Sequence, residues 1–416
     1  MPEPSGRSPE GLLPDALLAE LRERAVRYDR ENLFFDEDLE QLRDQGYLRL
    51  LVPVSSGGLG ADLLQAGRIQ RRLAQAAPAT ALAMNMHLVV TGAALHAQRR
   101  AGAAGHPGAR RILEDAAQDR LFAFGISEPG NEAMLFDAAT SAAPVAAQQA
   151  EGQGHVFTGT KIFTSLAPAW DRLIVHGRRE ADPGAGSEEE PSLVFAVLDR
   201  GAAVRTLDDW DTHGMRATQS RTTILDGAFA PAERTVTRTP VGPNPDPFVM
   251  GVFGCFELLI ASVYTGIAER AVQLGVETAR TRRSLTRGIQ HADDPDVRRR
   301  LAAAAIGVDG AVLQIEKLLA DLDALGAGTT GPGLQDHGPR WFLHFSGVKT
   351  RATEAAIAAV DQVLRASGGA HFSRRSELER ISRDVRAGMY HPSDEESVHA
   401  SHARALLGEI GTAPAG

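Results

Sequence analysis

The architecture of this chain is decided by two short stretches, Ile126-Ser127-Glu128-Pro129-Gly130 and Gly159-Thr160-Lys161-Ile162-Phe163-Thr164-Ser165. The first follows a strand-like run at 121–125 and predicts a turn, because proline fixes φ and glycine permits a positive φ. The second alternates apolar and hydroxyl side chains, which is typical of a half-buried strand. The two strands are expected to present Ser127 and Ser165 beside exposed backbone. Small hydroxyl groups and free backbone N–H groups suit a flat ring with polar edges.

The composition describes a soluble globular protein with more than one domain. The chain has 416 residues, of which 43% are hydrophobic and 23% are charged. At this length, two or three domains are expected. The formal net charge of −9 argues against a nucleic-acid partner. The only cysteine, Cys255, excludes an intrachain disulfide and a cysteine-ligated metal site within one chain, and no metal is expected.

The apolar segments predict neither a membrane span nor a secretory leader. No uninterrupted apolar run reaches the roughly 18 residues that a bilayer requires. The start of the chain, Met1-Pro2-Glu3-Pro4-Ser5-Gly6, lacks the apolar region of a signal peptide. We therefore expect a cytoplasmic protein.

The period of the hydrophobic pattern divides the chain into three domains. Residues 1–118 have helical spacing and predict an N-terminal α-helical domain. Residues 119–238 change to a period of two and predict a central antiparallel barrel or sandwich. A proline-rich linker follows, and helical spacing returns over 248–416. The predicted helices of this last domain are 248–287, 294–325, 339–370 and 376–388.

A third stretch, Gly214-Met215-Arg216-Ala217-Thr218, completes a pattern with the first two. With these three stretches, the chain resembles the acyl-CoA dehydrogenase superfamily of flavoproteins over nearly its whole length. The resemblance implies an α+β multidomain fold with an N-terminal helical domain, a central β-barrel or sandwich and a C-terminal four-helix bundle. It also implies bound FAD, or FMN if the protein is a monooxygenase, and it makes Arg216 a cation that ties barrel strands together.

The resemblance also assigns flavin-binding residues by their positions in the family motifs. The residues expected at the isoalloxazine ring are Phe124, Ile126, Ser127, Phe163 and Ser165. The residues expected at the pyrophosphate and the adenylate half are Arg282, Ser284, Gln362, Gly368 and Gly369. In the family this second group comes from a neighbouring subunit. The resemblance therefore implies a homo-oligomer, either a dimer or a homotetramer.

The sequence departs from the family pattern at the catalytic base. A dehydrogenase of this family needs a carboxylate to remove the α-proton of an acyl thioester while hydride leaves for the flavin. In the commonest branch, counting from Arg383-Asp384-Val385-Arg386 leads to Pro392, one residue after His391. In a second branch, the count leads to Phe256, next to Glu257. One residue is a rotation of about 100° on a helix, so Glu257 serves only if its helix is rotated.

Two histidines lie where the family forms its substrate cavity. His87 ends a helix that faces this cavity in the family, and His391 has the spacing found in flavin monooxygenases of the same fold. An imidazole with a pKa near neutral acts as a hydrogen-bond partner or a base. The candidate catalytic residues are His391, Glu257 and His87. The alternative roles are structural, with His87 in the core and His391 at a helix end.

The sequence leaves two reactions open. We favour the FAD-dependent α,β-dehydrogenation of an acyl thioester carried by CoA or an acyl-carrier protein, because the three-domain pattern agrees with that family. The alternative is a flavin-dependent monooxygenase that uses reduced flavin and O2. The first reaction calls for an electron-transfer flavoprotein as partner, and the second for a flavin reductase.

Overall fold

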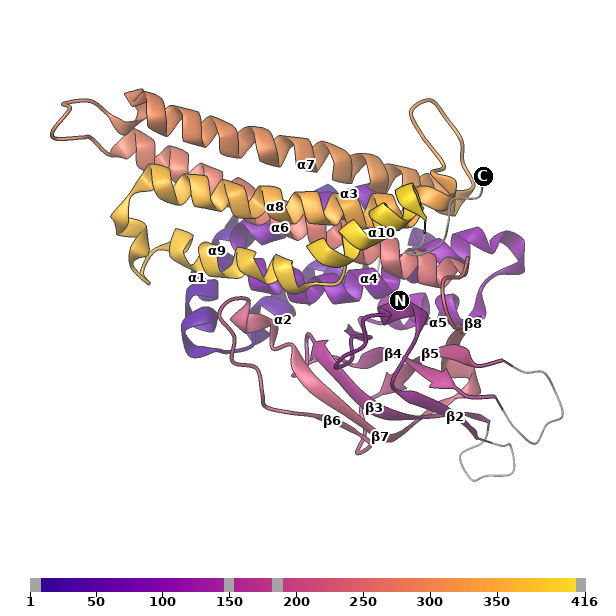
Figure 1. Ribbon diagram of the computed structural model, residues 1–416. Coiled ribbons are helices and arrows are strands. Elements are labelled where there is room, and N and C mark those ends of the chain that lie inside the picture. The colour runs from indigo at the N-terminus through magenta and orange to yellow at the C-terminus, as the bar shows by residue number, and fades with distance from the viewer. Residues whose placement is uncertain (1–8, 146–152, 182–189, 409–416) are drawn as a thin grey trace.

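A sheet from the middle of the chain is covered by helices from both ends. The computed structural model describes residues 9–145, 153–181 and 190–408. In Figure 1 the strands lie together at the bottom of the molecule, and helices from both ends of the sequence form the layers above them. The predicted α+β fold class, with helical, β and helical regions in that order, is confirmed.

Five α-helices precede the sheet in the described residues. They are α1 (Asp15–Glu31), α2 (Asp36–Gln45), α3 (Leu63–Ala76), α4 (Pro78–Arg100) and α5 (Pro107–Ala117). Asp62 caps α3, because its side chain accepts from the Gln65 N–H while the Gln65 side chain accepts from the Asp62 N–H. Helix α4 is buried along most of its length, since its sequence is apolar on all sides.

The described strands form one connected sheet. They are β1 (Phe122–Gly125), β2 (Ser141–Val145), β3 (Gly154–Thr164), β4 (Arg172–Arg179), β5 (Ser192–Asp199), β6 (Val204–Thr206), β7 (Arg221–Pro231) and β8 (Thr235–Pro240). Their order is β6-β7-β3-β2-β4-β5-β8, with β1 paired to β4. Most neighbours are antiparallel, as predicted. The exceptions are β1, which runs parallel to β4, and one parallel pair between β2 and β4.

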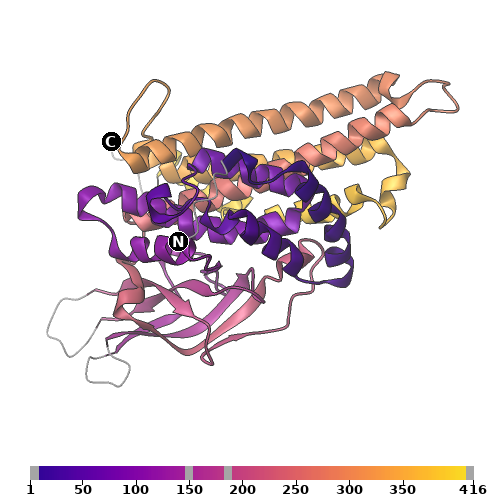
Figure 2. The same cartoon turned by 180° about the vertical axis from the view of Figure 1, so that it is seen from behind.

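The last part of the chain is mostly helical. Its long helices are α6 (Pro247–Thr281), α7 (Pro295–Ala327) and α8 (Trp341–Ser367). They are followed by the shorter α9 (Glu377–Asp384), the 3₁₀ segment η11 (Val385–Tyr390) and α10 (Glu395–Leu407). The predicted helix at 248–287 ends earlier, at Thr281, because Arg282 has an extended backbone. Figures 1 and 2 show α6, α7 and α8 side by side, with the α6–α7 connection projecting beyond the sheet.

Two helices form the apolar centre of the molecule. By length and composition, α4 and α6 would be able to cross a membrane, but 94% and 83% of their most apolar windows are buried inside the protein. Burial of this extent is typical of core helices in a globular protein. Their position between the sheet and the outer helices explains their apolar sequence.

Candidate functional site

The two stretches that decide the fold are joined by a buried ion pair and a backbone hydrogen bond. The Lys161 ammonium lies 2.7 Å from Glu128 Oε1, and both side chains are almost fully buried. The Ile162 N–H donates to the Ser127 carbonyl at 2.9 Å. Burial alone would raise the pKa of Glu128, but Lys161 lowers it to about 2, while burial lowers the pKa of Lys161 to about 8. The charged pair fixes the turn after β1 against β3.

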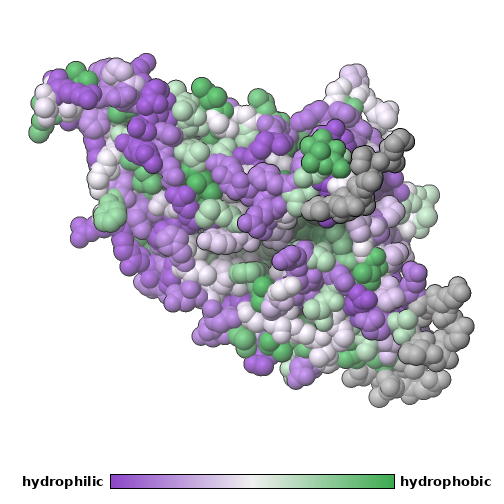
Figure 3. All heavy atoms as spheres, viewed as in Figure 1, coloured by the Kyte–Doolittle hydropathy of each residue, from purple (hydrophilic) through white to green (hydrophobic). Residues whose placement is uncertain are grey.

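A cavity of about 410 Å³ lies beside this junction, between the sheet and the helices. We call one set of its lining residues the sheet wall: Ser127, Phe163, Ser165, Thr218 and Ser220. We call a second set the helical wall: Arg383, Arg386, Ala387, Tyr390 and His391. Within the described part of the chain, none of the lining side chains is a carboxylate. Figure 3 shows that the surface is hollowed where the strand and helical halves meet.

Phe163 is held in an unusual backbone conformation at the sheet wall. Its φ of 55° lies in the left-handed region, which is uncommon for residues other than glycine. It sits in an irregularity of the β3–β7 pairing between Lys161 and Thr164. The residue is 54% exposed, and its ring meets Trp210 edge-on at a centroid distance of 6.3 Å. Residues with uncommon backbone conformations cluster at active sites and ligand sites. The exposed ring of Phe163 therefore indicates a candidate ligand site.

The sheet wall also carries a chain of hydroxyl groups. Ser165 Oγ lies 2.7 Å from Ser220 Oγ, and the Ser220 hydroxyl donates to Thr218 Oγ1 at 2.7 Å. The Thr218 hydroxyl in turn donates to the Met215 carbonyl at 2.9 Å. The three hydroxyl residues are at most 7% exposed. The chain therefore runs from the cavity into the protein with no carboxylate in it.

His391 on the helical wall is paired with a tyrosine. Its Nε2 lies 2.6 Å from the hydroxyl of Tyr264, which comes from the middle of α6. Burial, reinforced by the Lys349 ammonium, lowers the pKa of His391 to about 3. The imidazole is therefore neutral near physiological pH, well below the near-neutral titration that its residue type suggested.

A buried lysine holds the segment that carries His391. Lys349 is 1% exposed, and its ammonium donates to the carbonyls of Gly388, His391 and Ser393, each at 3.1 Å. The Ser393 hydroxyl donates to Glu257 Oε1 at 2.5 Å, and Glu257 is 1% exposed. Burial raises the pKa of Glu257, opposed by Lys349, and burial lowers the pKa of Lys349. The two groups anchor this segment from behind the cavity.

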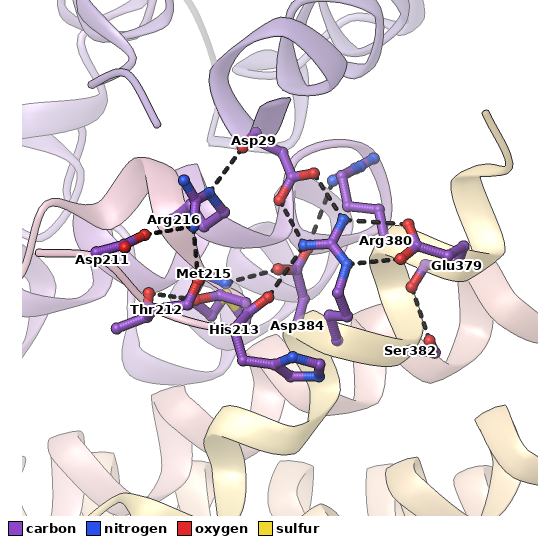
Figure 4. Close-up of polar contacts among 12 residues, drawn as sticks. Asp29, Asp211, Thr212, His213, Met215, Arg216, Glu379, Arg380, Ser382 and Asp384 are labelled. Atoms are coloured by element: carbon purple, nitrogen blue, oxygen red, sulfur yellow. Dashed lines mark hydrogen bonds and ion pairs between the residues drawn. The ribbon is translucent and has the colours of Figure 1, made fainter. Parts of the chain in front are cut away.

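A cluster of charged residues joins the three parts of the chain next to the helical wall (Figure 4). We call it the ionic cluster: Asp29, Glu379, Arg380, Arg383 and Asp384. Arg383 forms two hydrogen bonds with Asp29, at 2.9 and 2.7 Å, and two with Glu379, at 2.8 and 3.1 Å. Asp384 accepts from the Met215 N–H at 2.6 Å. The cluster therefore fixes Met215, where the hydroxyl chain ends.

Arg216 has a different role from the expected one. Its guanidinium donates to the Asp29 carbonyl on α1 at 2.9 Å and to Asp211 and the Thr212 carbonyl at 2.9 and 2.8 Å (Figure 4). The expectation that it ties barrel strands together is wrong. Because it lies in a short 3₁₀ segment beside α1, it joins the preceding loop to the N-terminal helices instead.

The structure brings together some of the sequence-predicted residues. Those lining the cavity are Phe124, Ser127, Phe163, Ser165 and His391. Ile126 is buried next to Ser127 and is 1% exposed. His87 does not line the cavity. Its Nε2 lies 2.8 Å from the Leu48 carbonyl and its Nδ1 accepts from the Phe122 N–H at 3.1 Å, so both ring nitrogens are occupied.

Other predicted residues lie outside the cavity. Glu257 follows the lining residue Phe256 on α6, yet its carboxylate faces Ser393. At the projecting end of the bundle, Arg282 donates to the Ser367 carbonyl at 2.9 Å, beside Gly368 and Gly369. Gln362 accepts from Arg300 there, and the Ser284 hydroxyl accepts from the Arg287 N–H. None of these groups lines the cavity in the single described chain.

The sequence patterns did not indicate that Tyr264, Ser220 and Lys349 belong to the candidate site. Tyr264 and His391 are 127 positions apart, and no local pattern indicates that pairing. Ser220 lies two residues beyond the recognised stretch that ends at Thr218. The signal for Lys349 was a lone lysine in an otherwise apolar helix face, because such a charge is buried only when it is partnered.

Comparison with known proteins identifies acyl-CoA dehydrogenase domains in both helical parts of the chain. The model for the C-terminal domain of acyl-CoA dehydrogenases matches residues 258–394, and the model for their N-terminal domain matches residues 15–99. L-evernosamine nitrososynthase from a Micromonospora species is 29% identical over 92% of this chain and 86% of its own length. YdbM of Bacillus subtilis, which carries the name of an acyl-CoA dehydrogenase, is 26% identical over 93% of this chain and 94% of its own.

A third relative and a solved structure extend the comparison. Dibenzothiophene monooxygenase from Rhodococcus qingshengii is 28% identical over 89% of this chain and 86% of its own length. The crystal structure of KijD3 in complex with FMN and a dTDP-linked amino-keto sugar superimposes with a TM-score of 0.78. It is 25% identical and covers 99% of this chain and 97% of its own.

Proposed function

Because the chain belongs to the acyl-CoA dehydrogenase superfamily, we propose that it is a flavin-dependent monooxygenase built on that fold. The observation that carries this proposal is the chemistry of the cavity lining. The described lining contains a neutral histidine paired with a tyrosine and contains no carboxylate. The nitrososynthase and monooxygenase relatives support the same choice.

The lining argues against the dehydrogenation that the sequence favoured. Removal of the α-proton of an acyl thioester requires a base within hydrogen-bonding reach of the substrate. Glu257 is buried behind the segment that carries His391, and its hydrogen bond runs to Ser393. A carboxylate held there acts as an anchor. Acyl-thioester dehydrogenation is therefore the less well supported reading.

The cavity fits a flavin ring. Phe163 offers an aromatic face, the hydroxyls of Ser127 and Ser165 offer polar contacts, and the indole N–H of Trp210 has no partner within the described protein. An unpartnered donor beside an aromatic cavity suits the polar edge of a ring ligand. When bound, the reduced flavin supplies the electrons that activate dioxygen. We propose FMN as the cofactor, since the similar solved structure of KijD3 holds FMN.

The residues of this chain have separate tasks in the proposed reaction. Phe163, Phe124 and Phe256 exclude water and pack against flat ligands. His391 is neutral, and its Nε2 is hydrogen-bonded to the Tyr264 hydroxyl, so it presents an oriented neutral imidazole to the cavity as a hydrogen-bond partner. The guanidiniums of Arg383 and Arg386 line the cavity but are ion-paired with Asp29 and Asp361, which do not line it, so their charge is compensated and the lining favours a neutral small organic substrate.

We propose a cytoplasmic homo-oligomer, a dimer or tetramer, in which Arg282, Ser284 and the 362–369 segment contact a neighbouring subunit. Reduced flavin would then come from a separate flavin reductase. Residues 1–8, on which the absence of a leader was argued, lie outside the described residues.

The reaction of the reduced protein with oxygen tests this function. Protein loaded with reduced FMN is mixed with O2 and followed by absorbance. We expect rapid oxygen consumption and a transient spectrum distinct from oxidised and reduced flavin. In His391→Gln the transient should form or decay at least about tenfold differently with unchanged FMN affinity. His399→Gln, altered at an exposed site on α10, is the control. Slow, direct reoxidation in the wild type would contradict the proposal.

A further inference from the structure

The hydroxyl chain of the sheet wall has only one direction that satisfies every group. A carbonyl oxygen accepts and never donates, so the proton of the Thr218 hydroxyl is used in its bond to Met215. Thr218 Oγ1 must then accept from Ser220, which uses the single proton of Ser220. Ser220 Oγ must therefore accept from Ser165 in their 2.7 Å contact.

The direction of this chain is anchored at its inner end. The Met215 N–H is held by Asp384 of the ionic cluster at 2.6 Å, and Asp384 is 2% exposed. The Met215 carbonyl also accepts from the Thr218 N–H at 3.1 Å. Reversing all three hydroxyl groups would give up the bond from the Thr218 hydroxyl to Met215 and would form no new bond within the protein. The Met215 carbonyl thus sets the direction of the hydroxyl chain, and Asp384 of the ionic cluster (Figure 4) holds the backbone of that residue.

The Ser165 oxygen consequently presents only its lone pairs to the cavity, because its proton is directed to Ser220. Any ligand group that lies against Ser165 Oγ must therefore be a donor. The edges of an oxidised flavin offer acceptors at N1, N5, O2 and O4, and its N3–H is the one ring donor. Reduction by two electrons and two protons adds one N–H at N5 and one at N1.

We propose that Ser220 and Thr218 are specificity-determining residues which, by orienting Ser165 as an acceptor, make the cavity prefer reduced flavin over oxidised flavin. This inference rests on the proposed flavin site and adds to it a redox-state preference. Ser220 and Thr218 act through Ser165, so both are positioning residues. In this proposal, the N5 edge of the ring lies against Ser165, because the N3–H donor is present in both redox states and would give no preference.

The test measures dissociation constants of oxidised and reduced FMN under anaerobic conditions. Wild-type protein should bind reduced FMN more tightly. Ser220→Ala removes the acceptor of the Ser165 proton, and Thr218→Val removes the acceptor of the Ser220 proton. Ser165 is then no longer held as an acceptor in either variant, so the preference should fall, by about fivefold in Ser220→Ala, the scale of one neutral hydrogen bond. Ser165→Ala should weaken the binding of reduced FMN alone. Ser141→Ala, in the exposed strand β2, should leave both constants unchanged.

A double-mutant cycle separates positioning from general damage. In a Ser165→Ala background, Ser220→Ala should have no further effect on the preference, because its effect passes through the Ser165 hydroxyl. Equal effects in both backgrounds, or no preference in the wild type, would overturn the inference while leaving the flavin site intact. Failure of the wild type to bind FMN in either state would instead overturn the proposed function.

Discussion

The two walls of the cavity differ in where they keep their charge. The sheet wall meets the cavity through the neutral hydroxyls of Ser127, Ser165 and Ser220, while the Glu128–Lys161 pair is buried behind it. The helical wall brings the guanidiniums of Arg383 and Arg386 to the cavity beside neutral His391, and Lys349 holds the segment that carries His391. Charge therefore only holds the backbone on the sheet wall, whereas on the helical wall it also reaches the cavity. Because both guanidiniums are ion-paired with carboxylates outside the lining, the cavity lacks a strong field of one sign.

Removal of the charge behind the helical wall should have the largest effect on folding. Lys349→Met leaves three carbonyls and Glu257 without their cation, and loss of one partner from a buried charge network costs about 3–5 kcal/mol. Denaturant unfolding measures this loss. The matched control is Arg68→Ala, which breaks a largely exposed pair with Glu316 and should change stability far less. Equal losses in the two variants would contradict the anchoring role of Lys349.

The pH dependence of the unfolding free energy should distinguish buried His87 from buried Glu257, because burial shifts their pKa values in opposite directions. Burial lowers the pKa of His87 to about 4 from an unfolded value of 6.5, so the unfolded state binds more protons between these values. The stability advantage of wild type over His87→Gln should shrink as pH falls from 6.5 to 4, by at most roughly 1.4 kcal/mol per pH unit.

Glu257 should show the opposite slope. Burial raises its pKa above the ordinary 4.5, so the folded state binds more protons above pH 4.5. Wild type should therefore lose stability relative to Glu257→Gln as pH rises from 4.5 through the raised pKa. Unfolding curves of the three proteins at several pH values provide the check. If the unfolding free energies of wild type and Glu257→Gln changed in parallel with pH, the pKa of Glu257 would not be raised by folding, which would contradict this prediction.

The sequence predicted the fold class and much of the sheet wall, because those features depend on local patterns. Proline, glycine and alternating residues around Ser127 and Ser165 mark a turn and a strand wherever they occur. The same motifs also indicated Phe124 and Phe163, and both residues line the cavity. Even the unusual backbone of Phe163 lies inside a stretch that the sequence singled out.

The helical wall was harder to predict, since its contacts join distant residues. Counting from a motif correctly predicted that His391 lies at the cavity, but it could not indicate its hydrogen-bond partner Tyr264. Counting also singled out Glu257, but it could not predict that the carboxylate faces Ser393. On a helix, adjacent residues differ by about 100°. Phe256 therefore faces the cavity while Glu257 faces Ser393 and Lys349. Which face is buried against what depends on tertiary packing and not on local spacing.

We propose that oxygen chemistry in this cavity proceeds without a carboxylate base. Anaerobic titration of the oxidised flavoprotein with a panel of acyl-CoA thioesters, followed at the flavin absorbance, tests it most directly. Because no described carboxylate lines the cavity, we predict that the flavin absorbance stays unchanged with every thioester in the panel. Complete bleaching by any one of them, retained in His391→Gln and lost in Glu257→Gln, would contradict the account and identify a dehydrogenase.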